Sequence, residues 1–314
     1  MSGMLAGLRL TQGIGTGARS RIYLAVDLKT GQRYAVKRVT RNSAEDDRFL
    51  EQAETEYEVS TKVDHPVIRK CFDVHRVRKL LQVKELYLVM EYVPGTGLDR
   101  SMPNRLAAFL NLFIRVSEGL GALHLAGYVH TDIKPNNIMI APGGVVKIID
   151  LGQACPIGHR KDRIQGTPDY IAPEQVERGA LTQRTDVFNL GATMYYLLTL
   201  KTYPTQVRGA DARGGIAIVD KDAPVVPIEI NPKIPLALSN LVMDCCREDP
   251  SKRPADMTQV QHRLRMIRDI WQRQREEFRR RRDVGQPEGM AQGGDEDEDL
   301  AEGSDAPGII ETTG

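Results

Sequence analysis

Cysteine is scarce in this sequence, with four residues in a chain of 314. Small secreted domains that rely on disulfides have a much higher cysteine density, so a disulfide framework is excluded. The four thiols also lack the paired spacing of a zinc site. We therefore expect a reducing, cytoplasmic setting in which the cysteines are small buried side chains. They are Cys71, Cys155, Cys245 and Cys246.

Long apolar runs are missing as well. A membrane-spanning helix needs about 20 consecutive apolar residues, and the best candidates, 106–114 and 190–200, are shorter or are closely followed by charge. The first ten residues, MSGMLAGLRL, have neither the basic start nor the apolar stretch of a secretory signal. The sequence predicts no membrane span and no secretory leader.

Charge is balanced overall but unevenly distributed. The 43 basic and 42 acidic residues give a net charge of +1, yet residues 284–314 hold nine acids and no Lys or Arg. Residues 1–283 therefore carry a net charge of +10. A glycine-rich acidic segment with few aromatic residues is not expected to fold alone. We expect an acidic disordered tail over 284–314.

A basic stretch precedes this tail, with nine arginines and four acids over 263–283. The simplest interpretation is a solvated helix end that closes the domain, with Trp271 packed on it. Binding of nucleic acid or anionic lipid is a second interpretation, which is not favoured because no aromatic residues are interleaved for base stacking. Contact of the acidic tail with the basic 263–282 helix is the third interpretation. Such a contact would be exposed, weak and salt-sensitive.

The first ninety residues have the pattern of a small β-rich lobe. Residues 44–62 are charged, with Phe49, Ala53 and Tyr57 at helical spacing, which predicts one amphipathic helix. Around it, β-branched and aromatic runs separated by glycine-rich turns predict short strands. The predicted strands are 8–10, 22–26, 34–39, 69–75 and 86–91.

Beyond Pro94-Gly95 the pattern becomes mainly helical. We predict an α+β, bilobal fold with a small antiparallel β lobe carrying one helix and a larger, mainly α-helical lobe. The predicted helices are 105–126, 184–200, 235–247 and 255–282. The predicted boundaries are 8–92 and 93–272 for the two lobes of one domain (8–272), 273–283 for a basic helical extension, and 284–314 for the tail.

A glycine-rich turn lies between the first two predicted strands. Glycine lets backbone N–H groups approach phosphate oxygens closely, although such a turn is also an ordinary hairpin. The segment reads Ile14-Gly15-Thr16-Gly17-Ala18-Arg19-Ser20-Arg21-Ile22.

Lys37 lies between apolar residues on the next predicted strand. A lysine in that setting either extends to solvent or meets an anion. Three acids on the following helix, Glu54, Glu56 and Glu58, could pair with the amine and hold it against phosphates. The residue pattern alone does not rank them.

The densest cluster of reactive side chains is His130-Thr131-Asp132-Ile133-Lys134-Pro135-Asn136-Asn137, followed by Asp150-Leu151-Gly152. Asp132 and Asp150 each lie near the end of an apolar element. Carboxylate and amide oxygens suit Mg²⁺, and a carboxylate that binds no metal can take a proton from a hydroxyl. Two unrelated turns capped by Asp and Asn are the alternative.

In order and spacing, these segments resemble the signature motifs of eukaryotic-type (Hanks-type) serine/threonine protein kinases over roughly residues 8–270. The compact arrangement is similar to that of bacterial members. The resemblance implies a structural ion pair between Glu174 and Arg253. The resemblance continues downstream through the segments GTPDYIAPE at 166–174, TDVFNLG at 185–191 and DPSKRP at 249–254.

The resemblance implies an ATP site between the lobes. The glycine-rich segment 14–22 would cover the phosphates, and Lys37 would hold the α- and β-phosphates. Glu56 would pair with Lys37, because it lies nine residues before His65-Pro66 as in the family. At the adenine end the family implies Met90 as gatekeeper, backbone bonds from Glu91 and Val93, and ring contacts from Ile22, Ala35 and Met139.

The resemblance also implies the catalytic roles. Asp132 would orient and deprotonate the substrate hydroxyl, and Lys134 would lie near the transferring phosphate. Asn137 and Asp150 would hold Mg²⁺. The segment 133–136 is similar to the Ser/Thr branch of the family, so Ser and Thr of protein substrates are the expected acceptors.

Four positions depart from the family pattern. Ser20 stands where a third glycine is common and should not block phosphate binding. Leu151 replaces the Phe of Asp-Phe-Gly and should keep its packing role, and Phe188 occupies a position usually held by Trp or Tyr, a change that should be tolerated. Thr131 stands where the family has an Arg that binds a phosphate on the activation loop. That loop, QACPIGHRKDRIQG over 153–166, contains no Ser, Thr or Tyr.

We therefore hypothesise that activity does not depend on phosphorylation of this loop. Its basic residues are expected to be solvated: His159, Arg160, Lys161 and Arg163.

The predicted function is γ-phosphoryl transfer from Mg·ATP to protein Ser or Thr, as in non-specific serine/threonine protein kinases. Two alternatives remain. A pseudokinase scaffold would bind nucleotide without transfer, although the family's catalytic residues are all present. A small-molecule phosphotransferase would have a related fold, although the segment 166–174 resembles the peptide-docking element of protein kinases.

Overall fold

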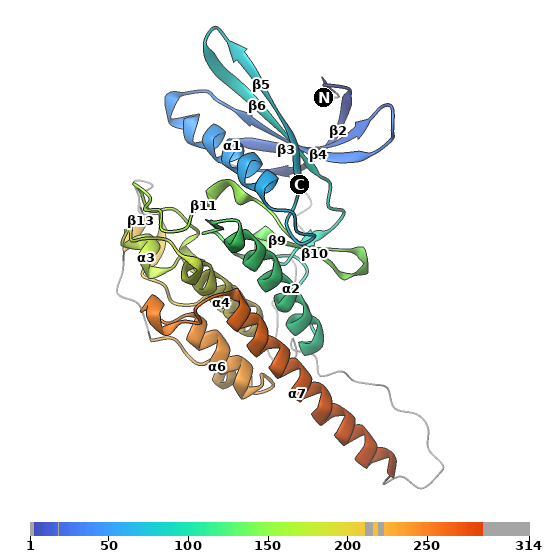
Figure 1. Ribbon diagram of the computed structural model, residues 1–314, viewed down its shortest axis with the longest axis vertical. Coiled ribbons are helices and arrows are strands. Elements are labelled where there is room, and N and C mark those ends of the chain that lie inside the picture. The colour runs from blue at the N-terminus through green and yellow to red at the C-terminus, as the bar shows by residue number, and fades with distance from the viewer. Residues whose placement is uncertain (1–2, 18, 211–215, 219–222, 285–314) are drawn as a thin grey trace, which may run out of the picture.

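The computed structural model describes residues 3–17, 19–210, 216–218 and 223–284. The predicted bilobal architecture is confirmed: a sheet with one helix forms the N-lobe, and a group of helices forms the C-lobe below it (Figure 1). Position 18 and the predicted acidic tail from residue 285 lie outside the described residues. The helices are α1 Asp47–Lys62, α2 Leu106–Leu125, α3 Pro173–Val176, α4 Gln183–Thr199, α5 Pro227–Ile230, α6 Leu236–Cys245 and α7 Met257–Val284.

The N-lobe is a six-stranded antiparallel sheet in the order β1-β2-β3-β4-β6-β5. The strand β1 was not predicted, because Gly3-Met4-Leu5, unlike Leu8-Arg9-Leu10, does not alternate apolar and polar residues. It forms a hairpin with β2 through Ala6 and Gly7, both at positive φ. The strands are β1 Gly3–Leu5, β2 Leu8–Thr16, β3 Ser20–Asp27, β4 Arg33–Thr40, β5 Cys71–Lys79 and β6 Gln82–Glu91.

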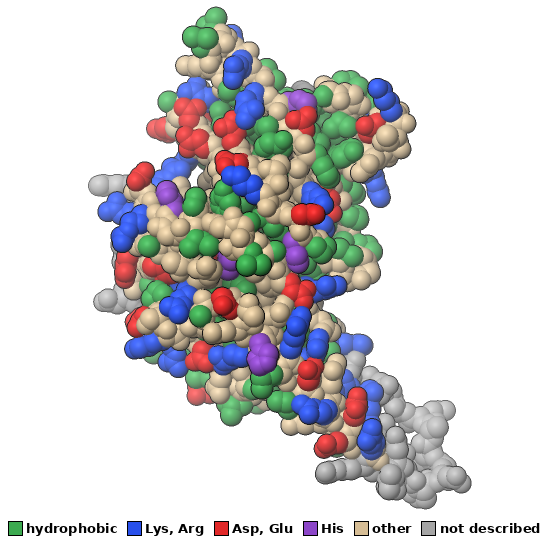
Figure 2. Space-filling view, in the orientation of Figure 1, with side chains coloured by type: hydrophobic (Ala, Val, Ile, Leu, Met, Phe, Trp, Pro, Cys, Tyr) green, Lys and Arg blue, Asp and Glu red, His purple; other side chains and the backbone are tan. Residues whose placement is uncertain are grey.

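The hairpin of β5 and β6 is longer than predicted. Its outer half extends past α1, so both faces meet solvent and the apolar alternation that marks a half-buried strand is absent there. Leu80 and Leu81 form the tip and are 94% and 98% exposed. They give the apolar patch at the top of the molecule (Figure 2).

The two faces of the sheet bury separate apolar clusters. On the α1 side, Ala35 and Val39 of β4 pack with Leu50 and Ala53 of α1. Val36 lies on the opposite face with residues from β2, β3 and β6. Because side chains alternate along a strand, Lys37 shares the face of Ala35 and Val39 and points toward α1.

The C-lobe is built around α2. Among the described residues, α2 is the one helix long and apolar enough to span a membrane by composition, but 61% of its apolar window is buried within the protein. Phe109, Phe113 and Leu120 of α2 are fully buried in the largest apolar cluster. The apolar composition of α2 thus reflects a core helix that is covered on most sides.

The predicted C-lobe helices are confirmed within two residues at each end. The first turns of α7 pack on the core through Val260, Leu264 and Ile267, and Trp271 is the last residue of the helix packed against it. Beyond it α7 projects from the lobe (Figure 1). Basic and acidic side chains are interspersed along the projecting part (Figure 2).

Within the described residues, short strands form three smaller sheets beside the N-lobe sheet. The segment after Asp150 is attached to the C-lobe because β11 pairs with β8, with Cys155 opposite Val129. The short strands are β7 Thr96–Gly97, β8 Tyr128–Val129, β9 Ile138–Ala141, β10 Val145–Ile148, β11 Cys155–Pro156, β12 Val207–Ala210 and β13 Ile216–Ile218.

Candidate active site

The sheet register brings the glycine-rich turn next to Lys37. Gly15 on β2 is opposite Ile22 on β3, and Ile22 is opposite Lys37 on β4. These three positions form one line across the sheet. The backbone of the turn therefore lies over the same face from which the lysine side chain projects.

Lys37 connects the N-lobe to the C-lobe. Its Nζ lies 2.8 Å from Glu56 Oε2 on α1 and 3.4 Å from Asp150 Oδ1. The other Glu56 oxygen accepts a hydrogen bond from Arg69. Burial opposes the charge on the amine, but the carboxylates of Asp150 and Glu56 outweigh it and raise the pKa of Lys37. In turn, Lys37 holds the pKa of Asp150 well below its usual range.

The choice among the three glutamates of α1 follows from their directions. Glu56 is 2% exposed at its side chain and faces Lys37. Glu54 binds Arg76 on β5, and Glu58 binds Lys62 one helical turn later. The structure therefore pairs Lys37 with Glu56 rather than with the other two.

Asp132 is held by three side chains. Its Oδ2 accepts from Lys134 Nζ at 2.8 Å and from Asn137 Nδ2 at 3.2 Å, while Oδ1 accepts from Thr167 Oγ1 at 2.8 Å. Lys134 Nζ also donates to the Thr167 hydroxyl at 2.7 Å. Thr167 was not predicted as a site residue, although it lies in the Gly-Thr-Pro motif. The fixed carboxylate is suited to accept a proton from a hydroxyl brought beside it.

Asn137 and Asp150 supply the oxygen ligands expected for Mg²⁺. The Asn137 amide donates to the Asp132 carbonyl at 2.8 Å, which fixes its orientation. Asp150 has a φ of 63°, and its side chain is 45% exposed beside Lys37. A carboxylate and an amide oxygen fit this hard cation. Among the described residues, no group of three or more His, Cys, Asp or Glu side chains is arranged to hold a metal ion.

The adenine-end residues lie where β6 leaves the sheet. Met90 is fully buried and lies opposite Ala35 in the register. The next residue, Glu91, binds Lys147 Nζ of β10 at 2.7 Å. Met139 of β9 lies opposite Lys147 and so approaches from the C-lobe. Val93 follows in the linker, where its carbonyl accepts from the backbone of Gly95.

Not every residue of the glycine-rich segment projects into the site. Arg19 Nε binds Asp46 Oδ1 at 2.8 Å, and Arg21 lies on the face opposite to Ile22 by strand alternation. The Gly17 amide donates to the Ser20 carbonyl and closes the turn. The segment thus presents backbone, whereas its charged side chains turn away. The other members, Ile14 and Thr16, lie on β2, and Ala18 lies outside the described residues.

Two residues that were not predicted position the catalytic segment. Asp186 of α4 is fully buried and accepts from the backbone N–H groups of His130 and Thr131, each at 2.8 Å, and from His124 Nε2. Burial disfavours its ionised form, but the hydrogen bond and charge of His124 lower the pKa of Asp186. Lys161 is also bonded to this segment. The prediction that this lysine is solvated is therefore wrong.

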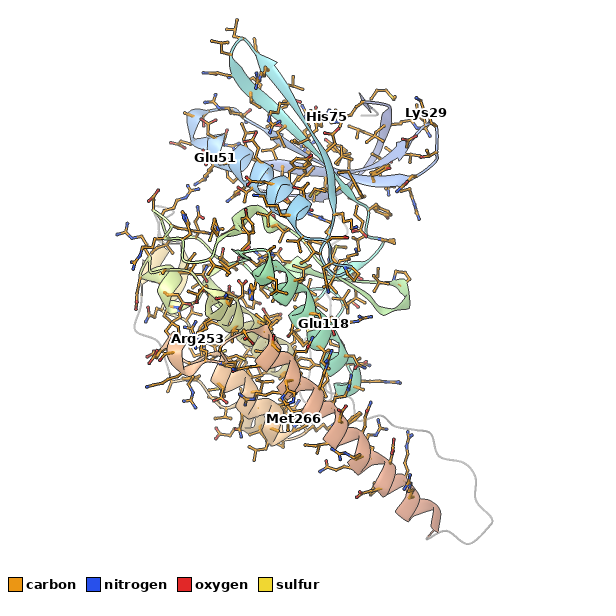
Figure 3. The ribbon with its side chains drawn as sticks, viewed as in Figure 1. Lys29, Glu51, His75, Glu118, Arg253 and Met266 are labelled. Atoms are coloured by element: carbon orange, nitrogen blue, oxygen red, sulfur yellow. The ribbon has the colours of Figure 1, made fainter. Side chains whose placement is uncertain are left out.

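Two structural expectations are confirmed. Arg253 binds both Glu174 oxygens at 2.8 and 2.9 Å, and it lies among the C-lobe helices (Figure 3). All four cysteines are free and buried. Burial raises the pKa of Cys155 to about 11, which keeps that thiol protonated near neutral pH.

These features define the bilobal fold and cleft of a protein kinase. The protein kinase domain family matches residues 8–264, and the chain belongs to this family. It is 30% identical over 254 residues to "Serine/threonine-protein kinase PknA" of Mycobacterium tuberculosis, covering 78% of this chain and 57% of that protein.

Other relatives have similar names. The chain is 27% identical over 287 residues to "Probable serine/threonine-protein kinase CA_C1728" of Clostridium acetobutylicum, covering 88% of this chain and 42% of that protein. It is 27% identical over 251 residues to "Serine/threonine-protein kinase PrkC" of Bacillus subtilis, covering 76% and 37%. The chain thus spans about half the length of the curated relatives it matches.

Proposed function

We propose that this chain is an active protein kinase that transfers the γ-phosphate of Mg·ATP to Ser or Thr hydroxyls of proteins. The observation that carries the proposal is the contact of Lys37 with both Glu56 and Asp150, which joins the sheet, α1 and the C-lobe at one point. The relatives PknA and PrkC are named as serine/threonine-protein kinases, which supports Ser and Thr as acceptors.

In the proposed reaction, Asp132 accepts the proton of the substrate hydroxyl as that oxygen forms a bond to the γ-phosphorus. The bond between this phosphorus and the bridging oxygen of ADP breaks, and ADP leaves with the electron pair. Lys37 binds the α- and β-phosphates, and Lys134 stabilises charge on the transferring group. Mg²⁺ held by Asn137 and Asp150 would neutralise charge on the phosphate oxygens.

The nucleotide would lie under the glycine-rich segment, with its adenine between the N-lobe side chains Ile22 and Ala35 and the C-lobe side chain Met139. Met90 would close the back of the cleft, and the linker backbone at 91–93 would supply the hydrogen bonds. The sheet register, which aligns Ile22 with Lys37 and Ala35 with Met90, supports this placement.

The proposal includes activity without phosphorylation of the loop 153–166, which has no hydroxyl acceptor. Thr167 and Tyr170 are the nearest candidates, but Tyr170 is buried and Thr167 is bonded to Asp132. Phosphosite mapping of active protein tests this point. Occupancy at either residue that tracks activity would overturn it.

We also propose that the acidic tail contacts the basic 263–282 helix. The opposite charges of the two segments support it, as does the exposure of Arg265. The hydrodynamic radius of the full chain should increase from low to high salt as screening releases the tail, whereas the radius of the chain without 284–314 should not change. Equal salt dependence of the two chains would exclude the contact. The cytoplasmic setting stays a prediction, as do the domain boundaries.

The decisive experiment is transfer of labelled phosphate from Mg·ATP to a mixture of basic proteins and to the chain itself. Asp132→Asn should abolish transfer to Ser and Thr, whereas Asp269→Asn, a matched control at an exposed position on α7, should retain it. If neither the wild type nor Asp132→Asn transfers phosphate, although both bind nucleotide, the scaffold alternative is favoured. Phosphorylation of a small molecule in place of protein would favour the other alternative.

A further inference from the structure

Lys161 of the activation loop contacts the catalytic segment directly. Its Nζ donates to Thr131 Oγ1 at 2.9 Å and to the Gln153 carbonyl at 2.7 Å. The Thr131 hydroxyl itself donates to the same carbonyl at 2.9 Å. Three polar groups from the middle of the loop, its start and the catalytic segment thus meet at one place.

The environment of Lys161 differs from that of a surface lysine. Burial lowers its pKa, because the amine leaves water and meets two neutral oxygens as its hydrogen-bond acceptors. A buried amine that lacked these acceptors would be costly. The lysine therefore stays in place only while the loop keeps its path along the C-lobe.

Thr131 uses every hydrogen-bonding group it has. Its N–H donates to Asp186 Oδ1, its hydroxyl donates to Gln153 and accepts from Lys161, and its carbonyl accepts from Gln175 Nε2 at 2.8 Å. The residue is fully buried and has a φ of 65°, a region that β-branched residues seldom adopt. Its neighbour in the chain is Asp132, so a shift of Thr131 moves the catalytic carboxylate.

The polarity of this contact is the reverse of the family pattern. There the catalytic segment supplies a cation, the Arg before the Asp, and the loop supplies a phosphate. Here the loop supplies the cation, Lys161, and the catalytic segment supplies an oxygen, Thr131. The activation loop therefore carries its own charged group and contains no residue that could receive a phosphate.

We propose that Lys161 is a positioning residue that takes the place of an activation-loop phosphate and keeps Thr131, and through it Asp132, in the geometry for phosphoryl transfer. This inference rests on the proposed kinase activity. The loop is anchored at its start by β11, in its middle by backbone hydrogen bonds of Gly158 and His159 with Leu181, and at its end by Thr167. Lys161 adds the side-chain contact that joins the middle of the loop to Thr131.

The first test compares Lys161→Met with Arg160→Met, a neighbouring exposed cation. We expect Lys161→Met to lower kcat about 10- to 100-fold, the scale of a small misplacement of a reacting group, with little change in the KM for ATP. Arg160→Met should retain wild-type kcat, and Lys161→Arg should retain most of it. Equal kcat in Lys161→Met and wild type would overturn the proposal.

The second test exchanges the two partners. Thr131→Arg should place two cations together, and Lys161→Glu should leave an unpaired carboxylate, so each single variant should lose activity. The double variant Thr131→Arg/Lys161→Glu should recover at least about tenfold over either single variant, as expected of residues in direct contact. Additive losses would contradict the proposal.

Hydrogen exchange separates this proposal from the kinase activity itself. In the protein without nucleotide, Lys161→Met should speed exchange over 153–166, and Arg160→Met should not. Unchanged exchange in Lys161→Met overturns the proposal whether or not the wild type transfers phosphate. Absence of transfer in the wild type, with faster exchange in Lys161→Met, would overturn only the proposed function.

Discussion

Two lysines near the candidate site, Lys37 and Lys161, differ in the groups that their side-chain amines contact. Lys37 lies between the carboxylates of Glu56 and Asp150, which raise its pKa. Lys161 meets the neutral oxygens of Thr131 and Gln153, and burial lowers its pKa. The first lysine is held as a cation that can meet phosphates. The second is held as a hydrogen-bond donor that fixes a loop, so burial of a lysine alone does not identify its role.

The substitution Lys37→Met should have the largest effect and tests whether the two lysines differ in role. We expect transfer to fall about 1,000-fold or more, the scale on which a cation at the transferring phosphates contributes. The loss should exceed that of Lys161→Met by at least about tenfold. Steady-state kinetics of both variants measures the difference. Equal losses would show that the two lysines do not differ in role.

A third buried cation, Arg253, extends the comparison to stability. Its guanidinium binds both Glu174 oxygens and three backbone carbonyls, so Arg253→Met leaves a buried carboxylate without its partner. We expect a loss of about 3–5 kcal/mol in the free energy of unfolding. Adding Glu174→Gln should recover part of it. Denaturant unfolding measures both values, and a loss below about 1 kcal/mol would contradict the expectation.

The pH dependence of the free energy of unfolding tests the lowered pKa of Lys161. Its pKa lies below the ordinary lysine value of 10.5, so the unfolded chain binds more protons at this site between those two values. The contribution of Lys161 to stability therefore rises as pH increases toward 10.5. The stability of wild type relative to Lys161→Met should grow between about pH 7 and 10. Relative to Arg160→Met it should stay constant; parallel curves for both variants would contradict this.

The smallest effect is expected at an exposed lysine. Lys70 binds Asp64 at 2.8 Å, but the two side chains are 49% and 91% exposed. Lys70→Met should leave the free energy of unfolding nearly unchanged, because water and salt screen such pairs. A larger change by denaturant unfolding would mean that exposure is a poor guide to these pairs.

The site around Lys37 could be predicted because strand alternation and motif spacing in the sequence determine which side chains meet there. Period-two alternation places Lys37 on the α1 face, and spacing within the family singles out Glu56. The contact of Lys161 could not be predicted, since its sequence neighbours Arg160 and Arg163 carry the same charge. Only the path of the loop along the C-lobe distinguishes them, and that path depends on packing between distant segments.

The same distinction applies to whole elements. The apolar period of α2 predicts its helix within one residue at each end, because that helix is itself the core. The outer half of the β5–β6 hairpin gave no strand signal, because neither face is buried. Apolar periodicity in the sequence indicates which face of an element is buried. It therefore does not predict elements that project from the core and bury neither face.

Asp186 has a consequence for the order in which the molecule assembles. Its carboxylate, on a helix buried in the C-lobe, determines the turn at His130 and Thr131 through two backbone N–H groups. Once α4 packs against the core, this turn has its hydrogen-bond partners without any contribution from the N-lobe. The turn at His130 and Thr131 should therefore form together with the C-lobe and open only when that lobe unfolds. The N-lobe would then pack against a C-lobe surface that has already folded.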